Sequence, residues 1–283
     1  MTLTESAPAK INLCLYLGPH RADGRHELVS VMQSITLADQ LRLSDLPDAD
    51  LDEVRCPGVD GPNLAASALA AFRTATGWDG SPQLLEIDKR VPVAAGLGGG
   101  SGDAAAALRL IARRAGIDDE SLLLELAMGL GADVPAQVRP GRVLATGAGE
   151  QLHRLSDPEP FGVLVLPSHA RLRTAAVYEQ ADRMGIGRSS AELAELAAAL
   201  VDKAPEAENE LEPAARALEP SIDATLAEAQ AAGAQAAMVS GSGPAVVGLF
   251  AAPQDAAEAA AALVGRDPPA IAAQPVVAGV RHN

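Results

Sequence analysis

The clearest chemical signal in this sequence is a glycine-rich stretch, VPVAAGLGGGSGDAAAAL, at residues 91–108. Five glycines fall within the seven residues from Gly96 to Gly102, between an apolar segment that contains Pro92 and an alanine-rich segment typical of a helix. Glycines leave backbone N–H groups unobstructed, and a helix N-terminus carries partial positive charge. The pattern predicts a cradle for a phosphate group. The structural alternative is a flexible loop, or a helix cap with Ser101 or Asp103 near the N-cap.

Two charged residues stand in settings that suit catalysis. Asp133 lies in GADVP, where neighbouring glycine and proline restrict the backbone and hold the carboxylate for use as a base or metal ligand. Lys10 lies in the apolar segment PAKINL and is one of three lysines in a chain that otherwise uses arginine, which favours a compact point charge at this position. The alternatives are a turn with a solvated aspartate and a lysine that extends from a strand edge to solvent.

Several other motifs are excluded or less specific. None of the lysines follows a glycine, so a Walker A loop is absent, and no G-x-G-x-x-G spacing occurs. HELVS at residues 26–30 lacks the second histidine of a zinc protease helix, and the turn around it is interpreted as surface structure. The small-residue turn SGSGP at residues 240–244 could bring backbone close to a ligand or to the glycine-rich loop.

Length and charge restrict the class of protein. The 283 residues suggest two domains, and a formal net charge of −15 argues against a nucleic-acid partner. Cys14 and Cys56 show no disulfide or zinc pattern, which fits a reducing cytoplasm. The N-terminus has no signal-peptide pattern, and the uncharged run 231–253 is broken by polar residues, so a strand–turn–strand is expected there and no membrane association.

Hydrophobic periodicity predicts the elements that position these residues. Strands are expected at 8–17, 26–43, 83–91, 138–146, 161–167 and 269–280, with two more around the turn at 240–244. Helices are expected at 62–76, from Ser101 to 116, at 119–130 and at 254–264, with further helices after 167. The segment SDPEP at 156–160 is the best candidate boundary. Because the elements do not alternate regularly, the expected fold class is α+β.

Taken together, the motifs resemble those of the GHMP kinases. PAKINLCLYL, VPVAAGLGGGSGDAAAAL and MVSGSGPAVVGLF are similar to the three ordered motifs of this family. DGRHEL, GADVP, GRVLATGAGEQL and NELEP are similar to strings of its 4-diphosphocytidyl-2-C-methyl-D-erythritol kinases, which serve non-mevalonate isoprenoid biosynthesis. The similarity runs in order from about residue 7 to residue 250.

The resemblance implies a fold and a reaction. It implies a two-domain α+β fold, with residues 1–152 forming a domain like domain 2 of ribosomal protein S5 and residues 153–283 forming an α/β C-terminal domain. It also implies transfer of a phosphoryl group from ATP, with Mg²⁺, to the C2 hydroxyl of a cytidine-diphosphate sugar alcohol, a small-molecule partner. A GHMP kinase with another acceptor, and a catalytically silent nucleotide-binding regulator on the same fold, remain the alternatives.

The resemblance also assigns roles to particular residues. Lys10 and Asp133 would form the catalytic pair, with Asp133 accepting or orienting the acceptor's hydroxyl proton and Lys10 keeping it ionised. ATP would contact Asn63 on its adenine side and, through its phosphates, Pro92, Val93, Ala94, Ala95, Gly96, Leu97, Gly98, Gly99, Gly100, Ser101, Gly102 and Asp103. The acceptor would contact Asn12, Arg25, His26, Thr174 and Tyr178, and no metal ligand is assigned.

Four residues depart from the family pattern. Arg25 stands where the family commonly has a tyrosine, so the planar guanidinium would replace one face of an aromatic sandwich on cytosine. Gly102 replaces a usual serine or alanine in the phosphate loop, and Ala136-Gln137 replace a usual pair that contains phenylalanine.

Overall fold

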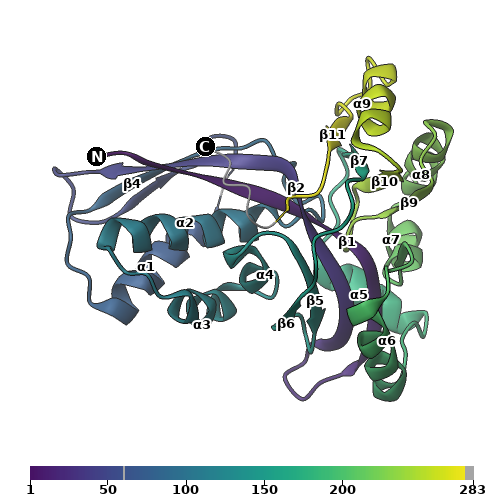
Figure 1. Cartoon of the computed structure of the whole chain (residues 1–283), viewed down its shortest axis with the longest axis horizontal. Helices are drawn as coiled ribbons and strands as arrows, with labels where there is room; N and C mark the ends of the chain where they lie inside the picture. The colour runs from purple at the N-terminus through teal and green to yellow at the C-terminus, as the bar shows by residue number, and fades with distance from the viewer. Residues whose placement is uncertain (60, 278–283) are drawn as a thin grey trace.

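The computed structural model describes residues 1–59 and 61–277. Its spine is a pair of antiparallel strands, β1 (Leu3–His20) and β2 (His26–Asp45), which run from one end of the molecule to the other and bend midway (Figure 1). Residues 7–18 of β1 are all buried, because other elements cover both faces of the strand. The predicted strands at 8–17 and 26–43 are thereby confirmed, and both extend further than predicted.

Five shorter strands join this pair in a seven-stranded sheet within the described residues. The order is β3-β4-β2-β1-β8, and β5 pairs with both β2 and β6. The bounds are β3 (Glu53–Arg55), β4 (Gln83–Asp88), β5 (Arg142–Thr146), β6 (Gln151–Arg154) and β8 (Glu208–Asn209).

A second sheet, of four antiparallel strands in the order β11-β7-β10-β9, is built from the later part of the chain. Its strands are β7 (Gly162–Leu166), β9 (Ala236–Val239), β10 (Val246–Phe250) and β11 (Ile271–Ala273). The uncharged run 231–253 thus contains β9, a turn and β10, as predicted. Along the described residues, no helix is both long and apolar enough to cross a bilayer.

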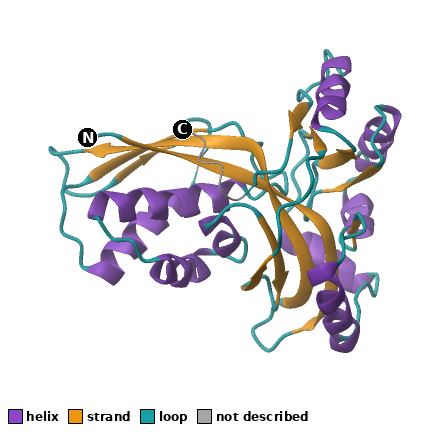
Figure 2. Ribbon diagram, in the orientation of Figure 1, coloured by secondary structure: helices purple, strands orange, loops and turns teal. Residues whose placement is uncertain are grey.

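The helices gather in two groups (Figure 2). Four lie beside the N-terminal half of β1 and the C-terminal half of β2: α1 (Leu64–Thr76), α2 (Gly99–Ala115), α3 (Glu120–Leu130) and α4 (Val134–Val138). Five lie near the second sheet and the bent end of β1 and β2: α5 (Thr174–Arg183), α6 (Ser190–Asp202), α7 (Glu212–Leu218), α8 (Ile222–Ala231) and α9 (Pro253–Ala262).

Helix α2 lies at the centre of the first group because its side chains are small. Residues 104–107 are four alanines, all fully buried. A Cβ atom at Gly102 would stand 2.9 Å from the carbonyl oxygen of Pro8, so glycine is what allows this close approach of the helix to β1. Glycine at position 102, where the family usually has serine or alanine, therefore allows α2 to pack closely against β1.

The two sheets share one apolar cluster. It includes Ile11 of β1 and Val31 of β2 together with Val163 of β7 and Val247 of β10. The late strand β8 also pairs with β1, through Leu15 and Asn209. The later half of the chain is therefore packed directly against the earlier half.

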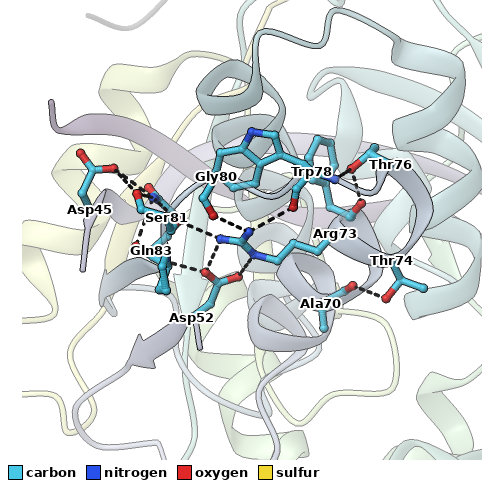
Figure 3. A network of polar contacts seen from close by, with 12 residues as sticks. Asp45, Asp52, Ala70, Arg73, Thr74, Thr76, Trp78, Gly80, Ser81 and Gln83 are labelled. Atoms are coloured by element: carbon cyan, nitrogen blue, oxygen red, sulfur yellow. Dashed lines mark hydrogen bonds and ion pairs between the residues drawn. The ribbon is translucent and has the colours of Figure 1, made fainter. Parts of the chain in front are cut away.

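Helix α1 is tied to the loop that leads into β4 by Arg73 (Figure 3). Its guanidinium donates to both carboxylate oxygens of Asp52, at 2.7 Å each, and to the carbonyl oxygens of Trp78 and Gly80. It also lies over the Trp78 ring, 4.4 Å from its centroid. This network fixes the C-terminal end of α1 against the edge of the first sheet.

Two predicted strands differ from the structure. The extended segment expected at 138–146 begins only at Arg142, because Val138 ends helix α4, which is too short to show a helical period in the sequence. The strand expected at 269–280 is limited to Ile271–Ala273, followed by one bridge at Pro275, since proline cannot donate to the ladder. Residues 278–280 lie outside the described residues.

Candidate active site

A cavity of about 530 Å³ collects most of the residues that the sequence singled out. Its walls come from β1, the N-terminal end of α1, the glycine-rich loop before α2, the turn before α4, helix α5 and the turn between β9 and β10. The predicted residues that line it are Lys10, Asn12, Asn63, Pro92, Val93, Ala94, Ala95, Gly96, Leu97, Gly98, Gly99, Gly100, Ser101, Asp103, Asp133, Thr174 and Tyr178. Gly102, Arg25 and His26 are outside this lining set.

Lys10 is the buried cation of the cavity. Its Nζ donates to Asn12 Oδ1 at 2.8 Å and lies 3.2 Å from Asp133 Oδ2. Asn12 is itself held by Ser30, whose Oγ accepts from Asn12 Nδ2 at 2.7 Å. Register irregularities between β1 and β2 occur on either side of the segment from Lys10 to Asn12, a feature that re-aims side chains at functional sites. The ammonium therefore has a defined position beside the carboxylate.

Asp133 is held by the start of a helix. It is the N-cap of α4, and Pro135 occupies the first turn, where its missing N–H costs nothing. The Asp133 side chain is one-third exposed, whereas that of Lys10 is 7% exposed. The carboxylate thus faces the cavity with a cation fixed behind it, which is a geometry suited to orienting a hydroxyl group.

The glycine-rich loop ends in a helix N-terminus that no side chain caps. Gly98 is the N-cap of α2 and has a left-handed backbone (φ 66°). Asp103 instead bonds to Lys89. The alternative of a cap by Ser101 or Asp103 is therefore wrong, and the first N–H groups of α2 stay available for an anion.

The turn at 240–244 braces this loop. Ser240 Oγ donates to the carbonyl oxygen of Gly96 at 3.2 Å. A Cβ atom at Gly96, whose φ is 77°, would stand only 2.0 Å from the Ser240 carbonyl oxygen. The predicted contact of SGSGP with the glycine-rich loop is confirmed, and it joins the second sheet to that loop.

An ion cluster beside the loop was missed by sequence reasoning. Lys89 Nζ donates to Asp39 Oδ2 at 2.5 Å and to Asp103 Oδ2 at 2.8 Å. Burial raises the pKa of Asp103 to about 7, although Lys89 opposes this shift. Burial lowers the pKa of Lys89, but its bonds to the two carboxylates outweigh that effect and leave it above its usual value. Two features of the sequence could have drawn attention to Lys89. Lysine is scarce in this chain, and Lys89 lies just before Pro92.

The predicted acceptor contacts divide into two sets. Thr174 and Tyr178 lie on α5 and line the cavity, and Thr174 Oγ1 is 3.1 Å from Ser242 Oγ. Burial is the main reason that the pKa of Tyr178 lies well above its usual value, so its hydroxyl stays neutral. His26 is next to this set, with its ring centroid 5.2 Å from that of Tyr178.

Arg25 lies apart from these residues. Its side chain is half exposed, and its guanidinium donates to Asp23 Oδ2 at 2.8 Å. The stacking role that the resemblance implies for Arg25 would use the face of the guanidinium, whose edge donates to Asp23.

Known protein families match segments in both halves of this chain. A family model described as the GHMP kinases N-terminal domain matches residues 63–141, and one described as GHMP kinases C terminal matches residues 187–267. The chain is 41% identical over 276 residues to a 4-diphosphocytidyl-2-C-methyl-D-erythritol kinase of Anaeromyxobacter sp. (strain K), covering 94% of this chain and 86% of the relative. It is 40% identical to the protein of the same name from Corynebacterium efficiens, covering 93% and 90%.

Solved structures show the same relationship. A crystal structure of 4-(cytidine 5'-diphospho)-2C-methyl-D-erythritol kinase superposes with a TM-score of 0.77 at 33% identity, covering 96% of this chain and 98% of that one. A homoserine kinase from Cytophaga hutchinsonii superposes with a TM-score of 0.68 at 18% identity, over 98% of this chain and 95% of that one, which shows a shared fold alone.

Proposed function

The chain belongs to the GHMP kinase family, whose members are ATP-dependent small-molecule kinases, and we propose that it phosphorylates the C2 hydroxyl of 4-diphosphocytidyl-2-C-methyl-D-erythritol. The observation that carries the choice of acceptor is the identity of about 40%, over nearly the whole chain, to relatives of that name. The Lys10–Asp133 pair, assembled at 3.2 Å in the same cavity as the glycine-rich loop, supports an active enzyme over a silent relative.

In this proposal ATP binds along the loop from Pro92 to Asp103. The uncapped N-terminus of α2 offers backbone N–H groups to the phosphates. Asn63, the N-cap of α1, lies on the cavity wall and would contact the adenine side. Lys89 lines the same wall, where its ammonium is paired with Asp39 and Asp103.

Transfer then requires positioning more than covalent chemistry. The C2 hydroxyl oxygen forms a bond to the γ-phosphorus, the bond from that phosphorus to the β,γ-bridging oxygen breaks, and ADP leaves. Asp133 orients the hydroxyl and accepts its proton as the new bond forms. Lys10, whose Nζ lies 3.2 Å from Asp133 Oδ2, stabilises the negative charge on the transferring group.

The residues near the loop fit a magnesium ion bound with the nucleotide. Asp103 lines this region with a side chain that is 4% exposed, and its buried Oδ1 has no hydrogen-bond partner among the described residues. Carboxylate oxygen is a preferred ligand of Mg²⁺, and the Ser101 hydroxyl lies in the same wall. We propose that Asp103 and Ser101 hold the ion, which when bound neutralises charge on the β- and γ-phosphates.

The acceptor would occupy the opposite end of the cavity, toward α5. The half-buried Tyr178 offers a ring for stacking on cytosine, and Thr174 and Asn12 offer polar groups to the sugar alcohol and its phosphates. His26, next to Tyr178, would contact the base. These assignments are proposals supported by shared position in or beside one cavity.

A cytoplasmic location is proposed on the thiols. Cys14 and Cys56 are both free, and Cys14 is buried in β1. Burial raises the pKa of Cys14 to about 11, so this thiol is protected from oxidation rather than prepared for a disulfide. Free cysteines are typical of reducing compartments.

An acceptor panel tests the proposed function. The purified chain is assayed with ATP and Mg²⁺ against the cytidylyl acceptor, mevalonate, phosphomevalonate and homoserine, with ADP release as the readout. Phosphorus NMR of the product locates the new phosphate. We expect turnover of the cytidylyl acceptor with phosphate on C2. Turnover of a different acceptor would identify another GHMP kinase activity, and ATP binding without turnover of any acceptor would support the silent regulator.

Arg25 provides a second test of the acceptor. Replacing Arg25 with tyrosine restores the residue that the family commonly has and removes the ion pair with Asp23. We expect Arg25→Tyr to lower the KM for the cytidylyl acceptor, with KM for ATP unchanged. A higher KM would show that the guanidinium makes its own contact with the acceptor.

A further inference from the structure

A cluster of three metal-binding side chains lies where the turn between β1 and β2 meets α5. His20 ends β1 and pairs in register with His26, which begins β2. Asp182 lies in the last turn of α5. Each histidine reaches one oxygen of this carboxylate: His20 Nε2 is 3.1 Å from Asp182 Oδ2, and His26 Nε2 is 2.8 Å from Asp182 Oδ1. The cluster therefore joins elements that are 156 or more residues apart in the sequence.

The three donor atoms are close enough to share one ion. They all lie within 4.8 Å of one another, and the centroids of the two imidazole rings are 3.9 Å apart. Zinc takes histidine nitrogen at about 2.0–2.1 Å and carboxylate oxygen at about 2.0–2.2 Å, so neighbouring ligands of a tetrahedral ion stand about 3.3 Å apart. The two measured N–O separations lie slightly below that value, and small side-chain rotations would open the space for an ion.

The chemistry of the donors selects a class of ion. Two imidazole nitrogens and one carboxylate oxygen suit zinc and similar divalent transition metals, whereas magnesium and calcium prefer oxygen ligands.

We propose that His20, His26 and Asp182 form a site for a zinc-type transition-metal ion, which joins the β1–β2 turn to α5. His26 would be the anchored ligand, since its side chain is 8% exposed, while His20 and Asp182 are 58% and 38% exposed and open to solvent. Three protein ligands leave a fourth position for water or another ligand. An ion here would be next to Tyr178, and therefore at the rim of the main cavity.

Metal binding to the whole chain, without nucleotide or acceptor, tests this site. Metal-freed protein is titrated with Zn²⁺ by calorimetry and with Co²⁺ by visible absorption, whose intensity reports a tetrahedral site. We expect one tight equivalent in the wild type and a rise in melting temperature with Zn²⁺. His20→Ala and Asp182→Asn change half-exposed side chains, and each should weaken binding roughly tenfold or more and abolish the thermal shift.

The matched control is His169→Ala. His169 is exposed and lies 3.0 Å from Asp267, so it forms a histidine–aspartate pair that has no place in the cluster. Wild-type affinity should persist in this variant. The proposal is overturned if the wild type binds no Zn²⁺ equivalent, if His20→Ala and Asp182→Asn bind as tightly as the wild type, or if His169→Ala lowers affinity as much as they do. Because no kinase substrate is present, a wrong acceptor assignment would leave this result unchanged.

Discussion

Lys10 and Asp133, the proposed catalytic pair, are held in place by hydrogen bonds and backbone geometry. Lys10 is fixed by a bond to Asn12, which is in turn fixed by Ser30, and Asp133 is fixed by the first turn of α4. Neither residue depends on a flexible loop for its position. The pair is therefore preorganised for a hydroxyl group that enters the cavity, which is the main requirement of phosphoryl transfer.

Removing the Asp133 carboxylate tests this role. We expect Asp133→Ala to lower kcat by about 10²- to 10⁴-fold, because both orientation and proton acceptance are lost. ATP affinity should change little, since the nucleotide contacts the loop before α2. Single-turnover kinetics and equilibrium ATP binding separate the two effects. Asp118→Ala, which removes an exposed carboxylate, is the matched control. Wild-type kcat in Asp133→Ala would exclude the residue from the mechanism.

Asp103 couples stability to pH. Its pKa is about 7 in the folded chain and near 3.8 when unfolded, so the folded state holds this proton more tightly. The stabilisation is fully present below pH 3.8 and is lost as pH rises through 7. Asparagine does not titrate. The free energy of unfolding of the wild type should therefore fall relative to that of Asp103→Asn between pH 5 and 8, by about 2 kcal/mol.

Urea denaturation of both proteins in the absence of nucleotide and metal measures this difference. If the difference in free energy of unfolding between the two proteins stays constant from pH 5 to 8, Asp103 is ionised throughout, because Lys89 dominates its environment.

At the scale of elements, α1 and α2 position different parts of the candidate site. Helix α2 is held close to β1 by small residues, and it points its uncapped end at the cavity. Helix α1 is fixed at its other end by Arg73, whose partners are Asp52, directly before the edge strand β3, and carbonyl groups of the loop between α1 and β4. The helix end that positions Asn63 thus depends on anchoring a full helix length away.

Arg73 should therefore matter for stability more than for chemistry. Its ion pair with Asp52 is mostly buried, with side-chain exposures of 24% and 13%. We expect Arg73→Ala to lower the free energy of unfolding by about 2 kcal/mol, because Asp52 loses its partner in a partly buried site. Arg55→Ala, which removes a half-exposed pair with Glu53, should change it much less, because solvent screens this pair. Equal effects of the two variants in urea denaturation would contradict this account.

At the scale of the whole molecule, lysine is scarce and is concentrated at the cavity. The net charge is −15, although both proposed substrates are polyanions. Two of the three lysines, Lys10 and Lys89, line the cavity, together with the N-terminus of α2. Attraction of the substrates is therefore local rather than a property of the whole surface.

The shared core predicts that the chain unfolds as one unit. Ile11 and Val31 of the first sheet are in the same apolar cluster as Val163 and Val247 of the second. The predicted domain boundary between residues 152 and 153 stays a prediction. The loop after β6 separates the two sheets along the chain, but the two sheets share this apolar core. Fluorescence of Trp78, the single tryptophan, reports the earlier half, and far-UV circular dichroism reports both. We expect the two thermal transitions to coincide, and separate midpoints would show independent domains.

Much of the fold could be predicted because its signals are local. The periodicity of residues 62–76 and 119–130 predicted α1 and α3 to within two residues, and the alternation in PAKINLCLYL predicted β1. The short helix α4 was missed and the short strand β11 was predicted too long, because segments of three to five residues carry too little pattern to outweigh their tertiary neighbours.

By itself, the sequence determined the family, and it predicted the glycine-rich phosphate loop and the candidate catalytic residues, since these depend on residue types and spacing along the chain. Only the tertiary structure decided which of them meet. It brought Lys10 to Asp133, Lys89 to Asp39 and Asp103, and both histidines of the β1–β2 turn to Asp182. These contacts join residues 14 to 162 positions apart, and their distances follow from the packing of strands and helices, which no local pattern encodes.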